Sequence, residues 1–392
     1  MATSFRRTTP KYATRALIDE AANANPPFAW HAPTVVFAAL CVMVGVYWDI
    51  SWHMTIGRDT FWTPAHLLIQ AGGLIAGITS GYVALRTTFG NDVAAKDAAV
   101  SFWGFRAPLG AWVSIWGCFA MVSSAPFDNW WHDAYGLDVR IISPPHTVLA
   151  LGIGAICVGA LLLSLAWQNR EGEFQRRAMW LFLASGALLL MDRAIMLTEY
   201  SFKNQQHGGL FYILSALAYP MALVVMTRAS KMKWAATITS AMFMALMLAL
   251  MWIIQLFPAT PKLGPIYQPV THMVAMAFPV LIIVPAIAVD LLMQRLNSRP
   301  LLLAPLLSVS FLALFLAVQW PFATFMMSPA ARNWFWNAEN FVYWMSSRGV
   351  ESARAWAGTS PTPADLGLAL LLGTFSCYVG LWFGDWMAKV RR

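Results

Sequence analysis

Long apolar runs separated by short polar stretches dominate this chain of 392 residues. A helix of about 20 apolar residues crosses a bilayer, and it satisfies its own backbone hydrogen bonds there. The pattern therefore predicts an all-α, polytopic membrane protein with about ten transmembrane helices built from repeated helical hairpins. The predicted spans are about 33–52, 64–86, 106–125, 145–167, 177–199, 209–227, 234–256, 270–292, 301–326 and 364–387.

Composition agrees with this fold class. The chain is 59% hydrophobic and 11% charged, whereas soluble domains carry about 25% charged residues. Its 20 Trp suit belts at the membrane–water interface. A net charge of +8 would also suit a nucleic-acid binder, but basic residues in a membrane chain more often set its orientation. We therefore expect a lipid bilayer, and no nucleic acid, as a partner.

Basic residues are distributed unevenly between the two sets of connections. One set holds 18 Lys and Arg and the opposite set holds 7. The positive-inside rule places the richer set, and with it both termini, in the cytoplasm. Six of the seven His then fall at the outer ends of spans. The richer set comprises the predicted cytoplasmic tail 1–32, the turns near 86–106, 168–177, 228–233 and 293–299, and the C-terminus.

A three-residue pattern occurs twice, in consecutive predicted hairpins. An Asp and a His lie four residues apart at the end of one span, and a second His opens the next span. Residues i and i+4 share one helix face, so each set is expected to converge at the mouth of its hairpin. Two imidazole nitrogens and one carboxylate oxygen suit Cu, Zn or Fe(II). The copies are Asp49-x3-His53-x12-His66 and Asp128-x3-His132-x13-His146.

The residues before the last His of each copy support this reading. Thr63 and Ser143 are natural N-caps, and Pro64 and Pro144 suit the first helical turn. Capping thus fixes where the third side chain enters. A lone His near the end of a span is more often an interfacial hydrogen-bonding residue, but repetition of the whole pattern favours two metal sites.

The second half of the chain, residues 169–392, predicts a six-helix membrane region with an outer connection at 327–362. The aromatic stretch Asn333–Met345 is interpreted either as an interfacial helix or as a structured loop with Trp anchors. Two hairpins in this half carry incomplete versions of the pattern, and we interpret them as structural remnants. They contain Glu199 with His207, and Gln255 with His272.

The stretch WHMTIGRDTFWTPAH (Trp52–His66) resembles the signature of the C subunit of particulate methane and ammonia monooxygenases, which are copper membrane monooxygenases. The similarity covers about residues 33–168, which would form a four-helix metal-binding membrane region. The resemblance implies that Asp49, His53 and His66 hold copper, and zinc also fits this kind of site.

The second triad departs from that family in one residue. The family has a second copper cluster of one Asn and two His with similar spacings, and Asp128 stands in place of the Asn here. A carboxylate adds a negative charge and favours a harder or more oxidised ion, which leaves the second metal open. The stretch Phe257–Met273 resembles part of the family's A subunit, so residues 169–392 are open to interpretation as a fused A-like subunit.

The expected function is that of a copper-dependent membrane monooxygenase, or its C-type subunit, that hydroxylates methane, ammonia or a short alkane with dioxygen. Asp49, His53 and His66 would be the catalytic ligands. The resemblance implies a bacterial inner membrane, metal sites toward the periplasm, and an oligomer with other monooxygenase subunits, one of them a periplasmic copper-binding subunit. It also implies a quinol as reductant. Supporting roles fall to Arg58 and Asp59, which would orient the ligands, and to an aromatic wall of Trp48, Trp52, Phe61, Trp62, Trp130 and Trp131.

Two other functions stay open from the sequence. A non-catalytic membrane protein of the same fold that holds or delivers copper would need the same ligands. A transporter built from repeated hairpins would place its site near the bilayer midplane, whereas the two clusters are predicted near the outer face. The spacing of ligands does not encode the volume or polarity of a pocket, so it does not specify the substrate.

Overall fold

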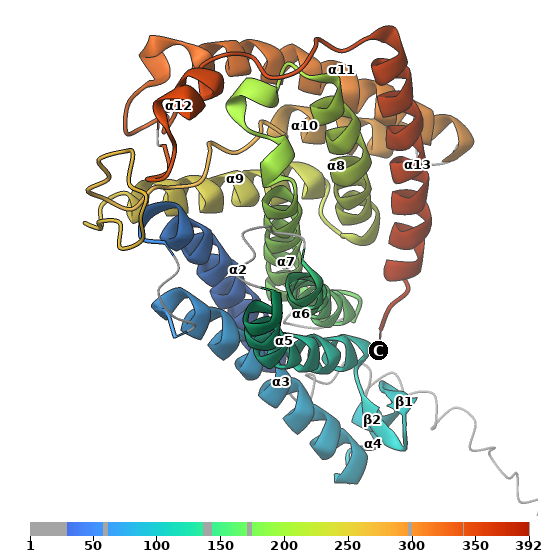
Figure 1. The fold of residues 1–392 in the computed structure, drawn as a ribbon. Coiled ribbons are helices and arrows are strands. Elements are labelled where there is room, and N and C mark those ends of the chain that lie inside the picture. The colour runs from blue at the N-terminus through green and yellow to red at the C-terminus, as the bar shows by residue number, and fades with distance from the viewer. Residues whose placement is uncertain are drawn as a thin grey trace, which may run out of the picture.

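The computed structural model describes residues 30–57, 62–135, 143–170, 175–296, 300–339 and 341–391. These residues are mostly helical (Figure 1). By length and composition, nine of the described helices can cross a membrane, which suits the multi-pass membrane protein predicted from the sequence. They are α2 (His31–Thr55), α3 (Pro64–Phe89), α5 (Leu109–Tyr135), α6 (Pro144–Gln168), α7 (Gln175–Met196), α8 (Gly209–Ala229), α9 (Ala235–Ile254), α11 (Pro300–Met327) and α13 (Pro363–Met387).

Shorter elements occupy the connections. The strands form one antiparallel hairpin, and its turn residues Trp103 and Gly104 have φ values of 49° and 82°. The described part of Asn333–Met345 forms turns and no helix, so the loop interpretation is correct there. The shorter elements are α4 (Val93–Asp97), β1 (Val100–Phe102), β2 (Phe105–Ala107), η1 (Thr198–Tyr200), η2 (Lys203–Gln205), α10 (Ile283–Leu296), η3 (Pro329–Ala331) and α12 (Ser347–Ala353).

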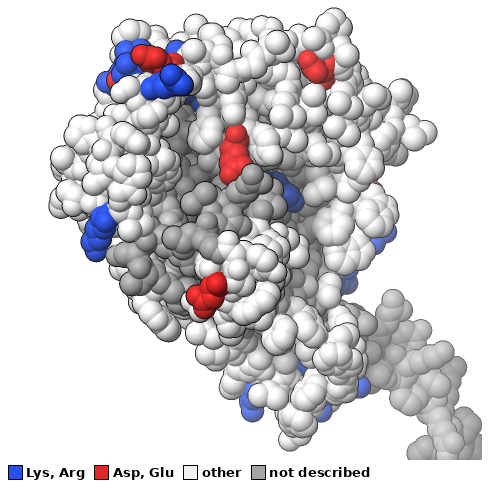
Figure 2. Space-filling view, viewed as in Figure 1, with Lys and Arg blue, Asp and Glu red and all other residues white. Residues whose placement is uncertain are grey.

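Charged side chains are sparse on the molecular face in Figure 2, where most of the surface is uncharged. One mixed group of basic and acidic side chains gathers over α12. A largely uncharged surface agrees with helices that face lipid. The predicted tail 1–32 lies mostly outside the described residues.

The helices α2, α3, α5 and α6 pack together in two consecutive pairs (Figure 1). Glycines permit the close approach within each pair. A Cβ atom on Gly72 of α3 would lie 2.8 Å from the Ala38 carbonyl oxygen of α2. A Cβ atom on Gly152 of α6 would lie 2.9 Å from the Gly117 carbonyl oxygen of α5. Small residues at such crossings are the usual means of close helix packing in membranes.

The third predicted span is longer than expected. It was predicted to end near residue 125, but α5 continues through Pro126 to Tyr135. Proline removes one backbone hydrogen bond from a helix interior, which is why the sequence suggests a boundary there. Because the helix continues, Asp128 and His132 lie on its last turns.

The eighth predicted span, 270–292, is wrong as a continuous helix. Residues 273–282 have no regular secondary structure, and α10 begins only at Ile283. Pro269 and Pro279 explain the interruption, because proline cannot donate a helical hydrogen bond and disfavours a helical residue before it. The segment is nevertheless apolar and largely buried, which is why its composition resembles that of a span.

Side chains from other elements satisfy the backbone of this irregular segment. The amide of Asn337 donates to the carbonyl oxygens of Met276, at 2.7 Å, and Ala275, at 3.3 Å. The side-chain oxygen of Gln319 on α11 accepts from the backbone N–H of Leu281 at 2.8 Å. Non-helical backbone at membrane depth is tolerated only when it is buried in protein or lines water. Here buried amide side chains fulfil that requirement.

A buried carboxylate fastens α10 to the start of α9. Asp290 is fully buried, and it accepts hydrogen bonds from the backbone N–H groups of Ala236, at 3.2 Å, and Thr237, at 2.8 Å. The hydroxyls of Thr227 and Thr237 each donate to it at 2.7 Å. The carboxylate thus supplies the acceptors that the first turn of α9 needs, from another helix.

We expect Asp290→Ala to lower the free energy of unfolding by about 3 kcal/mol, because several buried donors lose their acceptor together. The measurement is thermal unfolding of the full chain in detergent. Asp385→Ala is the matched control, since Asp385 is 51% exposed and pairs with Arg228 near the surface. Equal unfolding temperatures for the two variants would contradict the capping role.

Candidate metal centres

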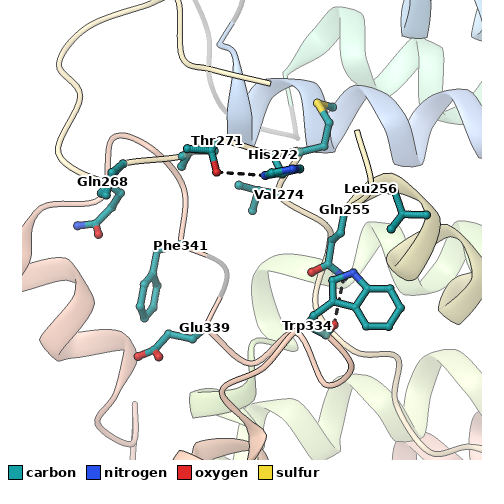
Figure 3. A pocket seen from close by; sticks show the side chains of 12 residues that line it. Gln255, Leu256, Gln268, Thr271, His272, Val274, Trp334, Glu339 and Phe341 are labelled. Atoms are coloured by element: carbon teal, nitrogen blue, oxygen red, sulfur yellow. Dashed lines mark hydrogen bonds between the residues drawn. The ribbon is translucent and has the colours of Figure 1, made fainter. Parts of the chain in front are cut away.

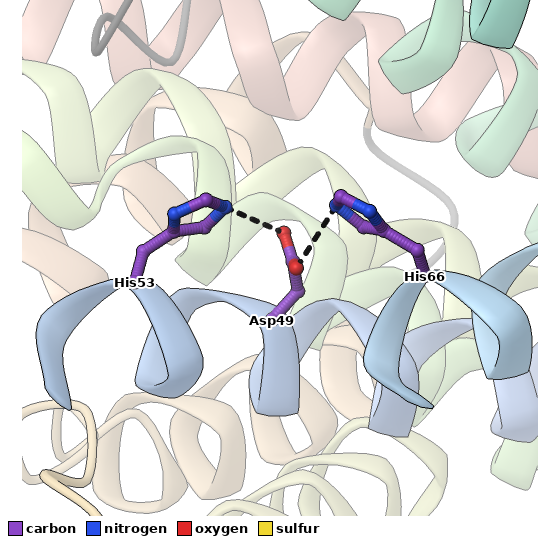
Figure 4. A group of neighbouring side chains, drawn as sticks. All are labelled: Asp49, His53 and His66. Atoms are coloured by element: carbon purple, nitrogen blue, oxygen red, sulfur yellow. Dashed lines mark ion pairs between the residues drawn. The ribbon is translucent and has the colours of Figure 1, made fainter. Parts of the chain in front are cut away.

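The first triad brings Asp49, His53 and His66 together at the end of the α2–α3 pair (Figure 4). Oδ2 of Asp49 lies 3.6 Å from Nε2 of His53, and Oδ1 lies 3.0 Å from Nε2 of His66. The two rings approach the carboxylate from opposite sides. One potential ligand atom from each residue lies within 4.8 Å of the other two.

Local structure explains this convergence. Asp49 and His53 are four residues apart near the end of α2, so they share one face of the helix. His66 is the third residue of α3, after Pro64 at its first position. The hydroxyl oxygen of Thr63, the predicted N-cap, accepts from the backbone N–H of His66 at 3.2 Å. Such a cap contributes about 1 kcal/mol and fixes where the His66 side chain enters the triad.

The second triad repeats the arrangement at the end of the α5–α6 pair. Oδ1 of Asp128 lies 3.1 Å from Nε2 of His132 and 3.5 Å from Nε2 of His146. Its potential ligand atoms also lie within 4.8 Å of one another. Ser143 caps α6 and accepts from the backbone N–H of His146 at 3.4 Å. In the described part of the chain, these two triads are the only groups of three or more His, Cys, Asp and Glu side chains that meet this criterion.

The two triads are neighbours. His146 of the second triad is one of the groups that act electrostatically on Asp49 of the first, together with His53 and His66. The contacts of α3 with α5 and of α2 with α6 explain why, since they place the two helix pairs side by side. Two similar donor sets therefore lie at the same end of one four-helix unit.

The chemistry of each donor set fits a transition-metal ion. A neutral imidazole has one N–H and one lone pair, so each Nε2 either donates a hydrogen bond to the carboxylate or turns a lone pair toward it. In the second tautomer a cation between the three groups would take up both lone pairs and offset the carboxylate charge. A metal ion with ligand bonds of about 2.0–2.2 Å would need only modest side-chain adjustment. Three protein ligands leave a coordination position open, as in catalytic rather than structural sites.

Access to the two triads differs. In the first, the His53 side chain is 39% exposed, whereas Asp49 and His66 are each 19% exposed. In the second, His132 is 8% exposed and His146 is 31% exposed. One imidazole of each triad thus borders the open side, while the carboxylate is mostly enclosed.

The predicted supporting residues are only partly placed. Arg58, Asp59 and Phe61 lie outside the described residues. Trp62 and Trp130 are 73% and 54% exposed in this chain. The remaining members of the predicted wall are half-buried, namely Trp48, Trp52 and Trp131.

The two predicted remnants have other surroundings. His207 lies between the parallel rings of Trp320 and Trp356, with centroid distances of 3.8 and 3.7 Å. Its Nε2 is 3.0 Å from the Trp320 carbonyl oxygen. This side chain joins α11 to the connection before α13, which agrees with the structural interpretation.

His272 borders a cavity that sequence reasoning missed (Figure 3). The cavity measures about 610 Å³. His272 Nδ1 lies 3.1 Å from Thr271 Oγ1, and Gln255 on another wall donates to the Trp334 carbonyl oxygen at 3.4 Å. The sequence feature that could have indicated this cavity is the group of polar residues around 255–272 in an otherwise apolar chain. Met273 and Val274 line this cavity and also begin the irregular segment 273–282.

Comparisons of this chain with protein-family models, with curated proteins and with solved structures found no match. Its function must therefore be inferred from its residues and their geometry.

We expect His66→Ala to remove metal from the first triad and to leave the second loaded, because two remaining ligands hold a metal ion weakly. His146→Ala should have the reciprocal effect. Elemental analysis of the purified full chain after copper loading measures both, with His272→Ala as a histidine control outside the triads. Full copper content in His66→Ala would refute the first site.

Proposed function

We propose that this chain is a copper-dependent membrane monooxygenase, or the C-type subunit of one, which hydroxylates a small apolar substrate with dioxygen. The observation that carries the proposal is the convergence of two Asp/His/His triads at one end of the four-helix unit. The resemblance of Trp52–His66 to the monooxygenase signature supports copper as the metal and monooxygenation as the reaction. In this proposal the triads face the periplasm of a bacterial inner membrane, and both termini are cytoplasmic.

Copper, when bound, would supply the redox chemistry of dioxygen activation. The protein residues would position it. The charge of Asp49 would offset that of the metal ion, while His53 and His66 fix its place between α2 and α3. The N-cap of Thr63 holds His66 in the first turn of α3, so its ring is oriented before metal arrives. Zinc suits the same donors, so elemental analysis is needed to identify which metal the protein binds.

The proposed reaction needs a reductant. One oxygen atom of dioxygen is inserted into a C–H bond of methane or an alkane, or into an N–H bond of ammonia. The product is an alcohol or hydroxylamine, respectively. The other oxygen atom is reduced to water, which consumes two electrons and two protons. A quinol supplies both electrons and both protons and becomes a quinone. We propose that the chain works in an oligomer with other monooxygenase subunits, including a periplasmic copper-binding one, in line with the resemblance.

The second triad favours one competing function. Asp128 gives this site a carboxylate, as in the first site, and a matched pair of charged sites also suits a protein that holds or delivers copper. The two functions share their ligands and differ in turnover. Copper retained without turnover in the complete complex is the outcome that distinguishes delivery from catalysis.

The proposed activity predicts oxygen-dependent product in membranes that contain the complete complex. We expect methane, ammonia or a short alkane to be hydroxylated at the expense of a quinol, and His66→Ala to abolish the product. Isotopically labelled dioxygen measures the reaction, because one labelled atom must appear in the product. His272→Ala, at the same end of the molecule, should retain activity. A fully copper-loaded complex that forms no labelled product from any of these substrates would refute the monooxygenase.

We also expect Asp128→Asn to weaken Cu2+ binding at the second triad by about tenfold or more, because a negative charge beside the ion is lost. Binding of Cu+ should weaken less, since the lower charge of the ion gains less from a carboxylate. The two affinities are measured by chelator competition in a His66→Ala background, which isolates the second site. Equal losses for both oxidation states would contradict a charge effect.

A further inference from the structure

The last two turns of α2 have two different faces. Asp49 and His53 lie on the face that forms the first triad. Ser51 and Thr55 are displaced by two residues, about 200° around the helix axis, so they lie on the opposite face. Both Ser51 and Thr55 are fully buried. Small polar residues in such a position require partners, because an unmade buried hydrogen bond is unfavourable.

Their partner is the irregular segment between α9 and α10. Ser51 donates through Oγ to the carbonyl oxygen of Val274 at 2.5 Å. The backbone N–H of Val274 donates to Oγ1 of Thr55 at 2.8 Å. The hydroxyl of Thr55 in turn donates to the carbonyl oxygen of Ser51 at 2.6 Å. We call this closed set of hydrogen bonds among Ser51, Thr55 and Val274 the α2 clamp.

Two further backbone contacts complete the end of α2. The N–H of Lys262 donates to the carbonyl oxygen of Ile56 at 2.9 Å, and that of Tyr343 donates to the carbonyl oxygen of Met54 at 3.3 Å. The last carbonyl groups of a helix otherwise lack partners, and an unsupported terminal turn frays. His53 lies in this last turn. Its position therefore depends on chain segments more than 200 residues away in sequence.

We propose that Ser51 and Thr55 are positioning residues for the first metal centre. In this role the α2 clamp fixes the final turns of α2 against the segment around Val274, and so fixes the distance between His53 and His66. The inference rests on the metal binding in the proposed function and adds the device that sets the geometry of one site. The clamp contacts fall on α2, so the second triad, carried by α5 and α6, serves as an internal reference.

The test uses the full chain in detergent with Cu2+ as the probe. A His146→Ala background leaves the first triad as the site to be measured. Thr55→Val keeps the shape of the side chain but removes both hydroxyl hydrogen bonds of the clamp. Thr55→Ser retains the hydroxyl and should restore binding. Thr34→Val is the matched control, since the Thr34 hydroxyl lies at the other end of α2 and donates to the carbonyl oxygen of its N-cap residue Trp30.

We expect Thr55→Val to weaken Cu2+ binding by about 10- to 100-fold, the range seen when supporting residues of metal sites are lost. Chelator competition measures the affinity, and the copper hyperfine splitting in electron paramagnetic resonance should change as well. Thr55→Ser and Thr34→Val should match the background protein. In a His66→Ala background, which isolates the second triad, Thr55→Val should leave affinity and spectrum unchanged. A general loss of folding would weaken both triads.

Unchanged affinity and spectrum in folded Thr55→Val would overturn the positioning role. Should that variant fail to fold, Ser51→Ala decides, because it removes only the hydrogen bond to the Val274 carbonyl. We then expect a smaller weakening at the first triad, and an unaltered site would again overturn the role. Lack of copper in the His146→Ala protein itself would instead refute the proposed metal site, and this inference with it.

Discussion

A carboxylate enclosed by apolar helices requires either a positive partner or several hydrogen-bond donors. This protein meets the requirement in different ways. Asp290 receives donors from two other helices, and Asp385 pairs with Arg228 near the surface. Asp49 and Asp128 face imidazole nitrogens, each of which either donates a hydrogen bond as N–H or offers a lone pair. In the described chain, these two carboxylates are the ones whose His neighbours form a donor set that could hold a metal ion.

Helix ends supply the geometry for both triads. In each, one helix contributes an i, i+4 pair from its last turns, and the capped first turn of the next helix contributes the third side chain. The rigid parts of the fold thus carry the donors, and glycine contacts hold the helices of each pair at close approach. The second pair differs in its proline at 126, which α5 accommodates without ending. The common design explains how two similar donor sets occur as neighbours in one unit.

The sequence was informative where a pattern is local. Hydrophobic length identified the long helices, and i, i+4 spacing with the caps Thr63 and Ser143 brought each triad together. It failed where the outcome depends on distant partners. The apolar run at 270–292 looked like a continuous span, because composition does not reveal that Asn337 and Gln319 satisfy the backbone of an irregular segment within it. The sequence likewise did not predict that Ser51 and Thr55 are buried, because their hydrogen-bond partner, Val274, lies in the other half of the chain.

The linkage of α2 to Val274 also has a consequence for biosynthesis. Residues 49–66 emerge from the ribosome long before residue 274, so the end of α2 first enters the bilayer without its final neighbours. The first triad reaches its mature surroundings only after α9 and the segment behind it have been made and packed. A chain truncated after α6 would carry all six triad residues yet lack the completed end of α2. Assembly order, and not the presence of the six side chains alone, then determines when the first triad reaches its final geometry.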